Sequence, residues 1–334
     1  MKRIGCIGYA THSGLGIILK DFVQHKLITD VLILEHEHFE NNYDWYPSSE
    51  SITRRVSPEK NQEFQVLINF IGSLDVIVIL ESPWNPYVIP LARKFNKKII
   101  LMANHEWTPW PLDVDMIICP SELEEVLYKS LISNIPIVHI NMPVNSEVTW
   151  NQRKHSLRFL HNSGRGSSND RNGTKLLIYS LNYINNEIDI SMRGQELAIY
   201  DNEELKKVSV INKTVDFKDL FVGYDTFVFI DRFCGLSLPL QEAYASGMAV
   251  ITGNRFPINT WLPKEGLIDP IGYEKLNFTG RSFDSAIYDP KVVADKIDEF
   301  HDRDITLLSS QGKEWGFNNS WDKLGVKYES LFQS

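Results

Sequence analysis

The chain has 334 residues, 43% of them hydrophobic, which predicts a globular protein with a large core and two domains. The formal net charge of −9 argues against broad, nonspecific adhesion to nucleic acid or anionic lipid, and is still compatible with a local basic patch. The N-terminus reads as a strand and a turn, and no apolar run reaches about 18 residues, so we expect no signal peptide, no membrane span and a cytoplasmic location.

Short apolar runs in the first part of the chain predict the strands of a parallel sheet. Each run is rich in Val, Ile and Leu and is bounded by polar or turn residues, as strands covered on both faces are. The predicted strands are residues 3–9, 31–35, 75–81, 97–103, 115–120 and 135–140. They indicate a Rossmann-like N-terminal domain at residues 1–150.

The same alternation restarts after a polar, proline-containing stretch at residues 142–156. The apolar runs are residues 157–162, 175–181, 187–192, 208–212, 225–230 and 248–253. They predict a second Rossmann-like domain at residues 151–314. Two such α/β domains are expected to face one another across a cleft at the carboxyl ends of their strands, where ligands bind.

The stretch CGLSLPLQEAYASGMAVI, Cys234 to Ile251, carries the most specific pattern. Here a loop leads through Pro239 into a predicted helix, and Glu242 is expected in the first turn of that helix. A carboxylate there is either a helix-terminus charge or a group presented to a ligand at the mouth of a parallel sheet.

Residues 220–254 resemble the donor-binding segment of family 4 glycosyltransferases, which have the GT-B fold. The residues in register are Gly235, Leu238, Pro239, Leu240, Glu242, Ala243, Gly247, Val250 and Ile251. Residues 161–181 are similar to the family's strand–loop segment with Arg and Lys, and residues 317–332 to its closing helix. The resemblance implies two Rossmann-like domains and a C-terminal closing helix at residues 315–334 that crosses back to the N-terminal domain.

A nucleotide sugar presents ribose hydroxyls and a charged diphosphate, so its site needs an acceptor carboxylate together with backbone or cationic donors. The resemblance implies that Glu242 binds the ribose. It also implies that the loop residues Gly235, Leu236, Ser237 and Leu238 face the sugar and phosphates. Candidate diphosphate cations are Arg165, Arg171 and Lys175, with Arg165 and Lys175 in catalytic roles. The choice between Arg165 and Arg171 is open, and each of the three could instead be a solvated surface charge.

Two N-terminal elements complete the expected site. Gly14 and Gly16 follow the first strand, as does the family's glycine loop, which approaches the donor diphosphate or the acceptor; any tight turn can use such a pair. His105 follows the fourth strand, where the family's His contacts the transferred sugar, although a lone His is more often structural. Glu106 and Trp107 are expected on the acceptor side.

The sequence departs from the family pattern at two positions of the loop. Cys234 stands where the family has a Glu, and Ser237 replaces a loop glycine. A thiol cannot accept hydrogen bonds as a carboxylate does, so either another group compensates, with Asp231 and Arg232 as the candidates, or the sugar is held differently. The three cysteines have no metal-ligand spacing, and we expect them to be reduced and mostly buried.

The sequence thus predicts a glycosyltransferase that moves a hexose from a nucleotide diphosphate sugar, UDP-glucose or a similar donor, to an unknown hydroxyl acceptor. The resemblance implies retention of the anomeric configuration and no cofactor or metal. We interpret the acidic stretch at 113–115 as structural. Two alternatives stay open: an enzyme that glycosylates hydroxymethylated bases in DNA, and an inactive nucleotide-sugar-binding protein.

Overall fold

The computed structural model describes residues 2–36, 40–110, 112–164, 170–194, 208–211, 215–278 and 281–334. The chain forms two compact units. Unit 1 comprises Met1–Pro143 together with Trp321–Ser334, and unit 2 comprises Val144–Ser320. Unit 2 therefore begins before residue 151, and the chain rejoins unit 1 at Trp321 instead of residue 315. No helix in the described ranges combines the length and apolar character that crossing a membrane requires.

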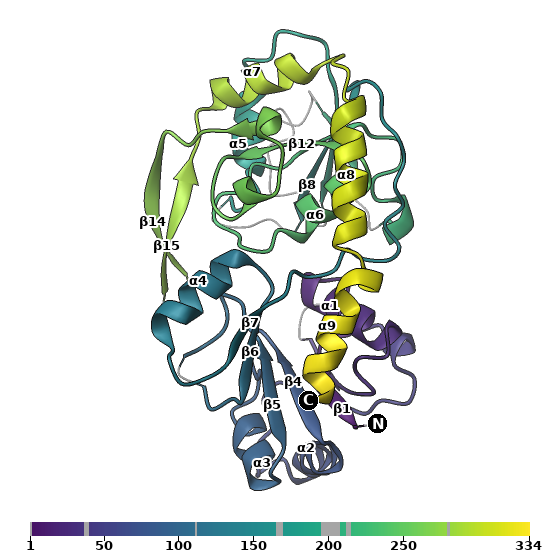
Figure 1. The fold of residues 1–334 in the computed structure, drawn as a ribbon, viewed down its shortest axis with the longest axis vertical. Helices are drawn as coiled ribbons and strands as arrows, with labels where there is room; N and C mark the ends of the chain where they lie inside the picture. Colours follow the sequence, from purple (N-terminus) through teal and green to yellow (C-terminus); the bar gives the residue numbers. More distant parts are fainter. Residues whose placement is uncertain are drawn as a thin grey trace. The chain divides into compact units, whose positions relative to one another are not determined.

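Unit 1 is built on a seven-stranded parallel sheet with the order β3-β2-β1-β4-β5-β6-β7 (Figure 1). The strands are β1 (Ile4–Gly8), β2 (Asp30–Leu34), β3 (Ser51–Ile52), β4 (Val76–Leu80), β5 (Lys98–Met102), β6 (Met116–Cys119) and β7 (Ile137–His139). The helices are α1 (Gly14–Gln24), α2 (Asn61–Ser73), α3 (Val88–Lys94), α4 (Glu122–Leu131) and α9 (Trp321–Gln333). All predicted strands of this half are present, and the two-residue β3 was not predicted.

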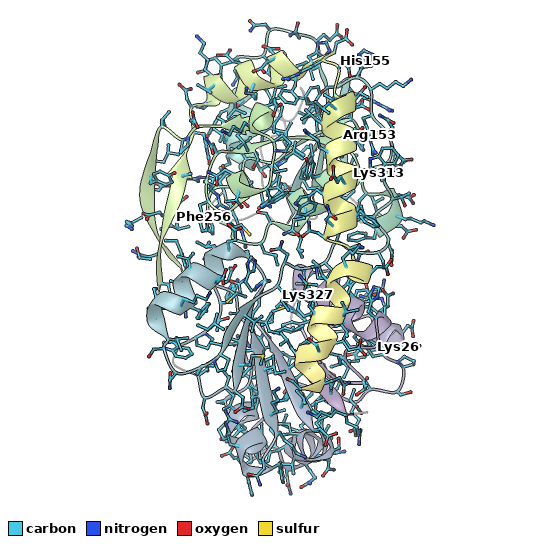
Figure 2. The ribbon with its side chains drawn as sticks, in the orientation of Figure 1. Lys26, Arg153, His155, Phe256, Lys313 and Lys327 are labelled. Carbon is cyan, nitrogen blue, oxygen red and sulfur yellow. The ribbon has the colours of Figure 1, made fainter. Side chains whose placement is uncertain are left out.

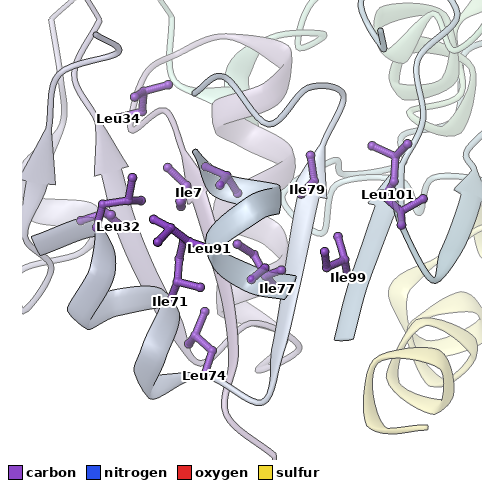
Figure 3. Packing of buried hydrophobic residues seen from close by; sticks show 14 of the residues in the cluster. Ile7, Leu32, Leu34, Ile71, Leu74, Ile77, Ile79, Leu91, Ile99 and Leu101 are labelled. Carbon is purple, nitrogen blue, oxygen red and sulfur yellow. The ribbon is translucent and has the colours of Figure 1, made fainter. Parts of the chain in front are cut away.

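The core of unit 1 explains why the apolar runs form strands. Ile77 and Ile79 of β4 lie two residues apart and share one face of the sheet (Figure 3). The same cluster includes Ile71 of α2 and Leu91 of α3. Every residue of β4 is buried, as expected for a central strand of a parallel sheet.

Helix α9, at the C-terminal end of the chain, belongs to unit 1 and packs against α1. Its Trp321, Tyr328 and Phe332 rings lie 5.5, 5.3 and 5.7 Å from the ring of Phe22 on α1. The Tyr328 hydroxyl donates to the carbonyl of Ile140 at 3.0 Å. The prediction that the C-terminal helix crosses back to the N-terminal domain is confirmed.

The predicted extent of this closing helix is wrong. Residues 315–318 are the end of α8 (Thr306–Asn318), which belongs to unit 2, and α9 starts only at Trp321. Asn319 ends α8, where its N–H and side-chain amide both donate to the carbonyl of Trp315 at 3.0 Å. Because the break is made by a single asparagine cap, the sequence periodicity did not reveal it.

Unit 2 contains a six-stranded parallel sheet with the order β10-β9-β8-β11-β12-β13. The strands are β8 (Arg158–Gly164), β9 (Asp189–Gly194), β10 (Ser209–Ile211), β11 (Thr226–Val228), β12 (Ala249–Gly253) and β13 (Leu267–Ile268). The helices are α5 (Thr174–Ser180), α6 (Leu238–Ala245), α7 (Pro290–Phe300) and α8. Numbered in chain order, this sheet runs 3-2-1-4-5-6, as do six strands of unit 1, which is the doubly wound order.

One predicted strand of unit 2 is a helix. Residues 175–181 lie almost entirely in α5, where Leu177 and Ile178 are buried while Lys175 and Tyr179 are exposed. Exposed residues four apart belong to one face of a helix, so burial here follows the helical repeat. The error arose because a short apolar run does not distinguish a buried helix from a strand.

An antiparallel hairpin in unit 2 was not predicted. It consists of β14 (Gly272–Phe278) and β15 (Arg281–Ile287). Its sequence mixes charged residues with single apolar ones, and Tyr273 is exposed while Ala286 opposite is buried. Such a strand pair lacks the continuous Val, Ile and Leu run by which buried parallel strands are recognised.

Candidate functional site at the carboxyl edge of the unit 2 sheet

The candidate site lies where the strand order of unit 2 reverses. Strand β8 pairs with β9 on one side and with β11 on the other. The connections that leave β8 and β11 therefore start side by side at the carboxyl edge of the sheet and lead away to opposite sides. Ligands of doubly wound sheets bind in the crevice formed at such a switch point.

The two connections are joined by Arg171, which follows β8. Its carbonyl accepts the N–H of Arg232 at 3.1 Å, and its guanidinium Nη2 lies 2.7 Å from Sγ of Cys234. The guanidinium also lies 5.6 Å from the ring centre of Phe233, a cation–π distance. Arg171 is thereby placed at residues 231–237, which we call the β11–α6 loop.

Ser237 ends this loop in a conformation that favours glycine. It is the N-cap of α6 and has φ of +44°, in the left-handed region. Its hydroxyl donates to the carboxylate of Asp231. This hydrogen bond offsets part of the strain of the left-handed conformation.

Two carbonyls of the loop are hydrogen-bonded within the residues that the structure describes, whereas several N–H groups at its end are not. The carbonyl of Cys234 accepts from Arg255, and that of Leu236 accepts from the Gln241 amide at 2.6 Å. Within the described part of the chain, the N–H groups of Gly235, Leu236 and Leu238 have no hydrogen-bond partner. N–H donors without a protein partner near the N-terminus of a helix suit an anion.

Glu242 does not lie in the first turn of α6, so this expectation is wrong. The helix begins at Leu238, its first turn has no acidic residue, and Glu242 is its fifth residue. The side chain is only 8% exposed. Because the helix macrodipole acts mainly within the first turn, the structure weakens the interpretation of Glu242 as a helix-terminus charge.

The three candidate cations have different surroundings. Arg171 contacts the β11–α6 loop, whereas Lys175 is the second residue of α5 and is exposed. Arg165 lies outside the described residues. Their roles toward a diphosphate stay predictions, and the geometry favours Arg171.

Asp231 and Arg232 are the candidates to compensate for the carboxylate that is absent at Cys234. Both side chains form hydrogen bonds within unit 2. Asp231 is 1% exposed and accepts N–H groups of its own loop. Arg232 donates to the carbonyl of Ala286 at 2.9 Å and forms an ion pair with Glu274 on the hairpin. Both side chains are thus engaged by other parts of unit 2, and compensation by either of them stays a prediction.

In unit 1, His105 follows β5 and is 4% exposed. Its Nδ1 lies 2.7 Å from Oε1 of Glu124. Oε2 of the same carboxylate accepts the hydroxyl of Ser121, the N-cap of α4. Burial raises the pKa of Glu124, but the hydrogen bonds from His105 and Ser121 outweigh it, and the pKa lies below its ordinary value. The carboxylate orients the ring so that Nδ1 donates, leaving Nε2 3.8 Å from Glu106.

The other candidate residues of unit 1 differ in how deeply they are buried. Gly16 is required by close packing, because a Cβ there would lie 2.0 Å from the carbonyl of Thr11, and Gly14 is the exposed first residue of α1. Glu106 is buried, whereas Trp107 is 41% exposed. Their donor and acceptor roles stay predictions, as does that of His105.

Arg93 forms ion pairs with both aspartates of the acidic stretch at 113–115. Arg93 donates to Asp113 at 2.9 Å and to Asp115 at 2.8 Å, and Asp115 also accepts the N–H of Ile99 at 2.7 Å. These contacts tie α3 to β5. Among the described residues, no group of three or more His, Cys, Asp or Glu side chains is arranged to hold a metal ion.

Sequence reasoning missed Arg255, which follows β12. It is 7% exposed and forms a buried ion pair with Asp231. In the sequence it appears as one arginine in a turn-like stretch between Gly253 and Pro257, and no spacing signal marks it. Only the adjacency of β11 and β12 in the sheet brings the two residues together.

Comparison with solved structures identifies the architecture. HepE from Anabaena, solved with UDP and glucose, has 9% sequence identity over 100% of both chains, with a TM-score of 0.72. Sucrose-phosphate synthase from Thermosynechococcus elongatus has 13% identity, covers 100% of this chain and 98% of its own, and gives 0.69. A TarM variant from S. aureus, solved with UDP among its ligands, has 10% identity over 100% of both chains and gives 0.71.

The chain therefore has the GT-B fold of two Rossmann-like domains, as predicted. No protein-family model matches the sequence, and a search of curated proteins gives no match. Membership of glycosyltransferase family 4 stays a prediction.

Proposed function

We propose that the protein is a glycosyltransferase that binds a nucleotide diphosphate sugar at the β8–β11 switch point of unit 2 and transfers the sugar to a hydroxyl acceptor. The observation that carries this proposal is the junction of Arg171 with the β11–α6 loop, 2.7 Å from Cys234. A guanidinium and several N–H donors at one sheet edge match the charge and geometry of a diphosphate.

The proposed chemistry is electrostatic. When the sugar C1–O bond breaks, negative charge grows on the leaving phosphate. Arg171 and the N–H groups of Gly235, Leu236 and Leu238 would stabilise that charge more strongly than the ground state. Glu242 would accept hydrogen bonds from the ribose, which anchors the nucleotide without taking part in bond cleavage.

We further propose a UDP-hexose donor, retention of configuration, and catalysis without a metal or other cofactor. HepE has been solved with UDP-glucose and a TarM variant with UDP, which makes UDP-glucose the first donor to test. Arg171 would supply the positive charge at the diphosphate that a metal ion would otherwise supply. The hydroxyl acceptor is a glycan, a protein, a small molecule or a modified base in DNA.

The test has a binding stage and a turnover stage. Thermal unfolding with UDP-glucose, UDP-N-acetylglucosamine, GDP-mannose and ADP-glucose should show one nucleotide class raising Tm, because a ligand of the native state stabilises it. Nucleotide release is then measured in the presence of a chelator, with pooled glycan, protein and hydroxymethylated-DNA acceptors. No stabilisation by any donor would refute the proposal.

Matched charge variants make the binding stage specific. Arg171→Met and Lys175→Met each remove one cation from neighbouring positions of the same segment. Arg171→Met is expected to weaken binding of the stabilising nucleotide about tenfold or more, and Lys175→Met much less, since only Arg171 contacts the loop. The opposite ranking would assign the diphosphate to Lys175.

The inactive binding protein remains a second candidate because a thiol stands against Arg171 where the family has a carboxylate. Donor binding without nucleotide release in any acceptor pool would favour it over the glycosyltransferase.

A further inference from the structure

The β11–α6 loop is fixed internally by one buried carboxylate. Oδ1 of Asp231 accepts the N–H groups of Phe233 at 3.0 Å and Cys234 at 2.8 Å, and Oδ2 accepts the hydroxyl of Ser237. Asp231 therefore contacts both the beginning and the end of the loop. Its own ionised charge is compensated by Arg255.

Arg255 reaches the loop from the neighbouring β12. Its guanidinium donates to the Asp231 carboxylate and to the carbonyl of Cys234, and its Nε donates to the carbonyl of Asp231 at 3.3 Å. A further N–H donates to the carbonyl of Phe256 at 3.0 Å. Only a planar guanidinium offers so many donors in a fixed arrangement, so lysine could not reproduce this set.

The hydrogen bond from Arg255 to the Cys234 carbonyl also determines the direction of the Gly235 N–H. The C=O of Cys234 and the N–H of Gly235 belong to one planar peptide group and point in opposite directions. Because Arg255 holds the carbonyl on the buried side, the Gly235 N–H is turned to the other side. The described residues provide no partner for that N–H.

We infer that Arg255 is a positioning residue of the nucleotide site, which acts through Asp231 and Cys234 to aim the Gly235 N–H at the bound diphosphate. The inference rests on the proposed function and adds to it a residue that does not touch the ligand. The ion pair keeps the loop in its binding conformation before the nucleotide arrives, so that little ordering free energy is lost on binding.

Arg153 provides a matched control in the same unit. It is also a buried arginine that donates to backbone carbonyls, at 3.1 Å to Tyr224 and at 3.0 Å to Phe221. These carbonyls precede β11, whereas the β11–α6 loop follows it. Arg153 also donates to the carbonyl of Ser246, at the end of α6 that lies away from the loop. Figure 2 shows Arg153 beside α8, well apart from Phe256, the neighbour of Arg255.

The experiment compares Arg255→Lys with Arg153→Lys. Both variants should lower Tm, because each loses several buried hydrogen bonds. Calorimetry with UDP, GDP and ADP, well below both transitions, should show about tenfold or greater loss of nucleotide affinity for Arg255→Lys alone. Equal affinity of Arg255→Lys and the wild type, or equal losses in the two variants, would overturn the inference.

A second measurement needs no nucleotide. Cys234 is 9% exposed, whereas Cys6 and Cys119 are 0% exposed, so alkylation by N-ethylmaleimide followed by peptide mass analysis reports on the loop. Arg255→Lys should speed alkylation of Cys234 several-fold, and Arg153→Lys should not. If Arg255→Lys does not fold, Asp231→Asn, which keeps the shape and removes the charge, is measured in its place with the same expectation.

The outcomes separate the two proposals. A wild type that binds none of UDP, GDP and ADP refutes the proposed function and with it the positioning role. A wild type that binds one of them, together with an Arg255→Lys variant of unchanged affinity and unchanged Cys234 alkylation, refutes the positioning role alone.

Discussion

At the scale of single residues, the first prediction concerns the proposed contact of Glu242 with the nucleotide. Glu242→Ala should weaken nucleotide binding by about 1.5–3 kcal/mol, the range for a hydrogen bond to a charged group. Because the residue is 8% exposed and lies beyond the first turn of α6, its side chain adds little to the helix terminus. Calorimetry with the stabilising nucleotide tests this, with circular dichroism to verify the fold. Unchanged affinity in a folded variant would remove Glu242 from the site.

Cys234 gives a second prediction, based on its contact with Arg171. A thiol accepts the guanidinium hydrogen bond without neutralising its charge, so Cys234→Ala should keep most of the nucleotide affinity. Cys234→Glu should lower the affinity about tenfold, because a carboxylate would pair with Arg171 and compete with the diphosphate. Titration of both variants with the same nucleotide tests the ranking, and tighter binding by Cys234→Glu would contradict it.

His161 of β8 predicts a pH dependence of stability. Its Nδ1 donates to the carbonyl of Val228 at 2.8 Å and its Nε2 accepts from Thr174 at 2.8 Å, which defines a neutral tautomer. Burial lowers the pKa of His161 to about 4 from the ordinary 6.5. Below pH 6.5 the unfolded chain therefore takes up a proton that the folded chain does not bind until the pH nears 4.

The stability that neutral His161 contributes is complete above pH 6.5 and is lost as pH falls toward 4. At about 1.4 kcal/mol per pH unit, the loss amounts to about 3 kcal/mol. Urea unfolding of the wild type and of His161→Asn at pH 7.5, 5.5 and 4.5 isolates this residue, because asparagine does not titrate. The wild type should lose more stability than the variant over this range, and parallel pH profiles would contradict the assignment.

At the scale of elements, the turn into α6 balances backbone strain against one hydrogen bond. Ser237→Ala keeps the φ of +44° and removes the hydroxyl bonded to Asp231, so it should destabilise the protein by about 1–2 kcal/mol. Ser237→Gly loses the same bond and relieves the strain, so it should cost clearly less. Urea unfolding ranks the two variants, and an alanine variant as stable as glycine would show that the turn is not strained.

At the scale of the whole molecule, the return of α9 to unit 1 makes the stability of that unit depend on the end of the chain. Tyr328 is 0% exposed and contacts Phe22. Tyr328→Ala should cost about 3–5 kcal/mol, as large-to-small core substitutions do. Tyr328→Phe, which loses only the hydroxyl contact with Ile140, should cost about 1 kcal/mol.

Hydrogen exchange read by mass spectrometry tests where this loss falls. Amides of residues 2–36 and 40–110 should lose protection in Tyr328→Ala, and those of unit 2 should not. Equal loss in both units would mean that they unfold as one cooperative body.

Features of the fold that depend on local composition could be predicted from the sequence. The runs of Val, Ile and Leu predicted most strands of both sheets because buried parallel strands need apolar residues on both faces. The stretch Cys234–Ile251 predicted the loop, α6 and β12, because Pro239 fixes φ at a helix start and the glycines permit tight turns. Where the composition was ambiguous, as in residues 175–181, the sequence alone gave the wrong element.

Contacts between residues far apart in the sequence became known only from the fold. Arg171 contacts Cys234 because β8 and β11 pair, and Arg255 reaches Asp231 because β11 and β12 pair. Pairing between parallel strands joins residues separated by a whole crossover connection, and its hydrogen bonds are made by backbone groups common to every residue. No spacing in the sequence records such a contact, so the sequence predicted a ligand-facing role for the loop, and only the fold showed which residues hold the loop in place.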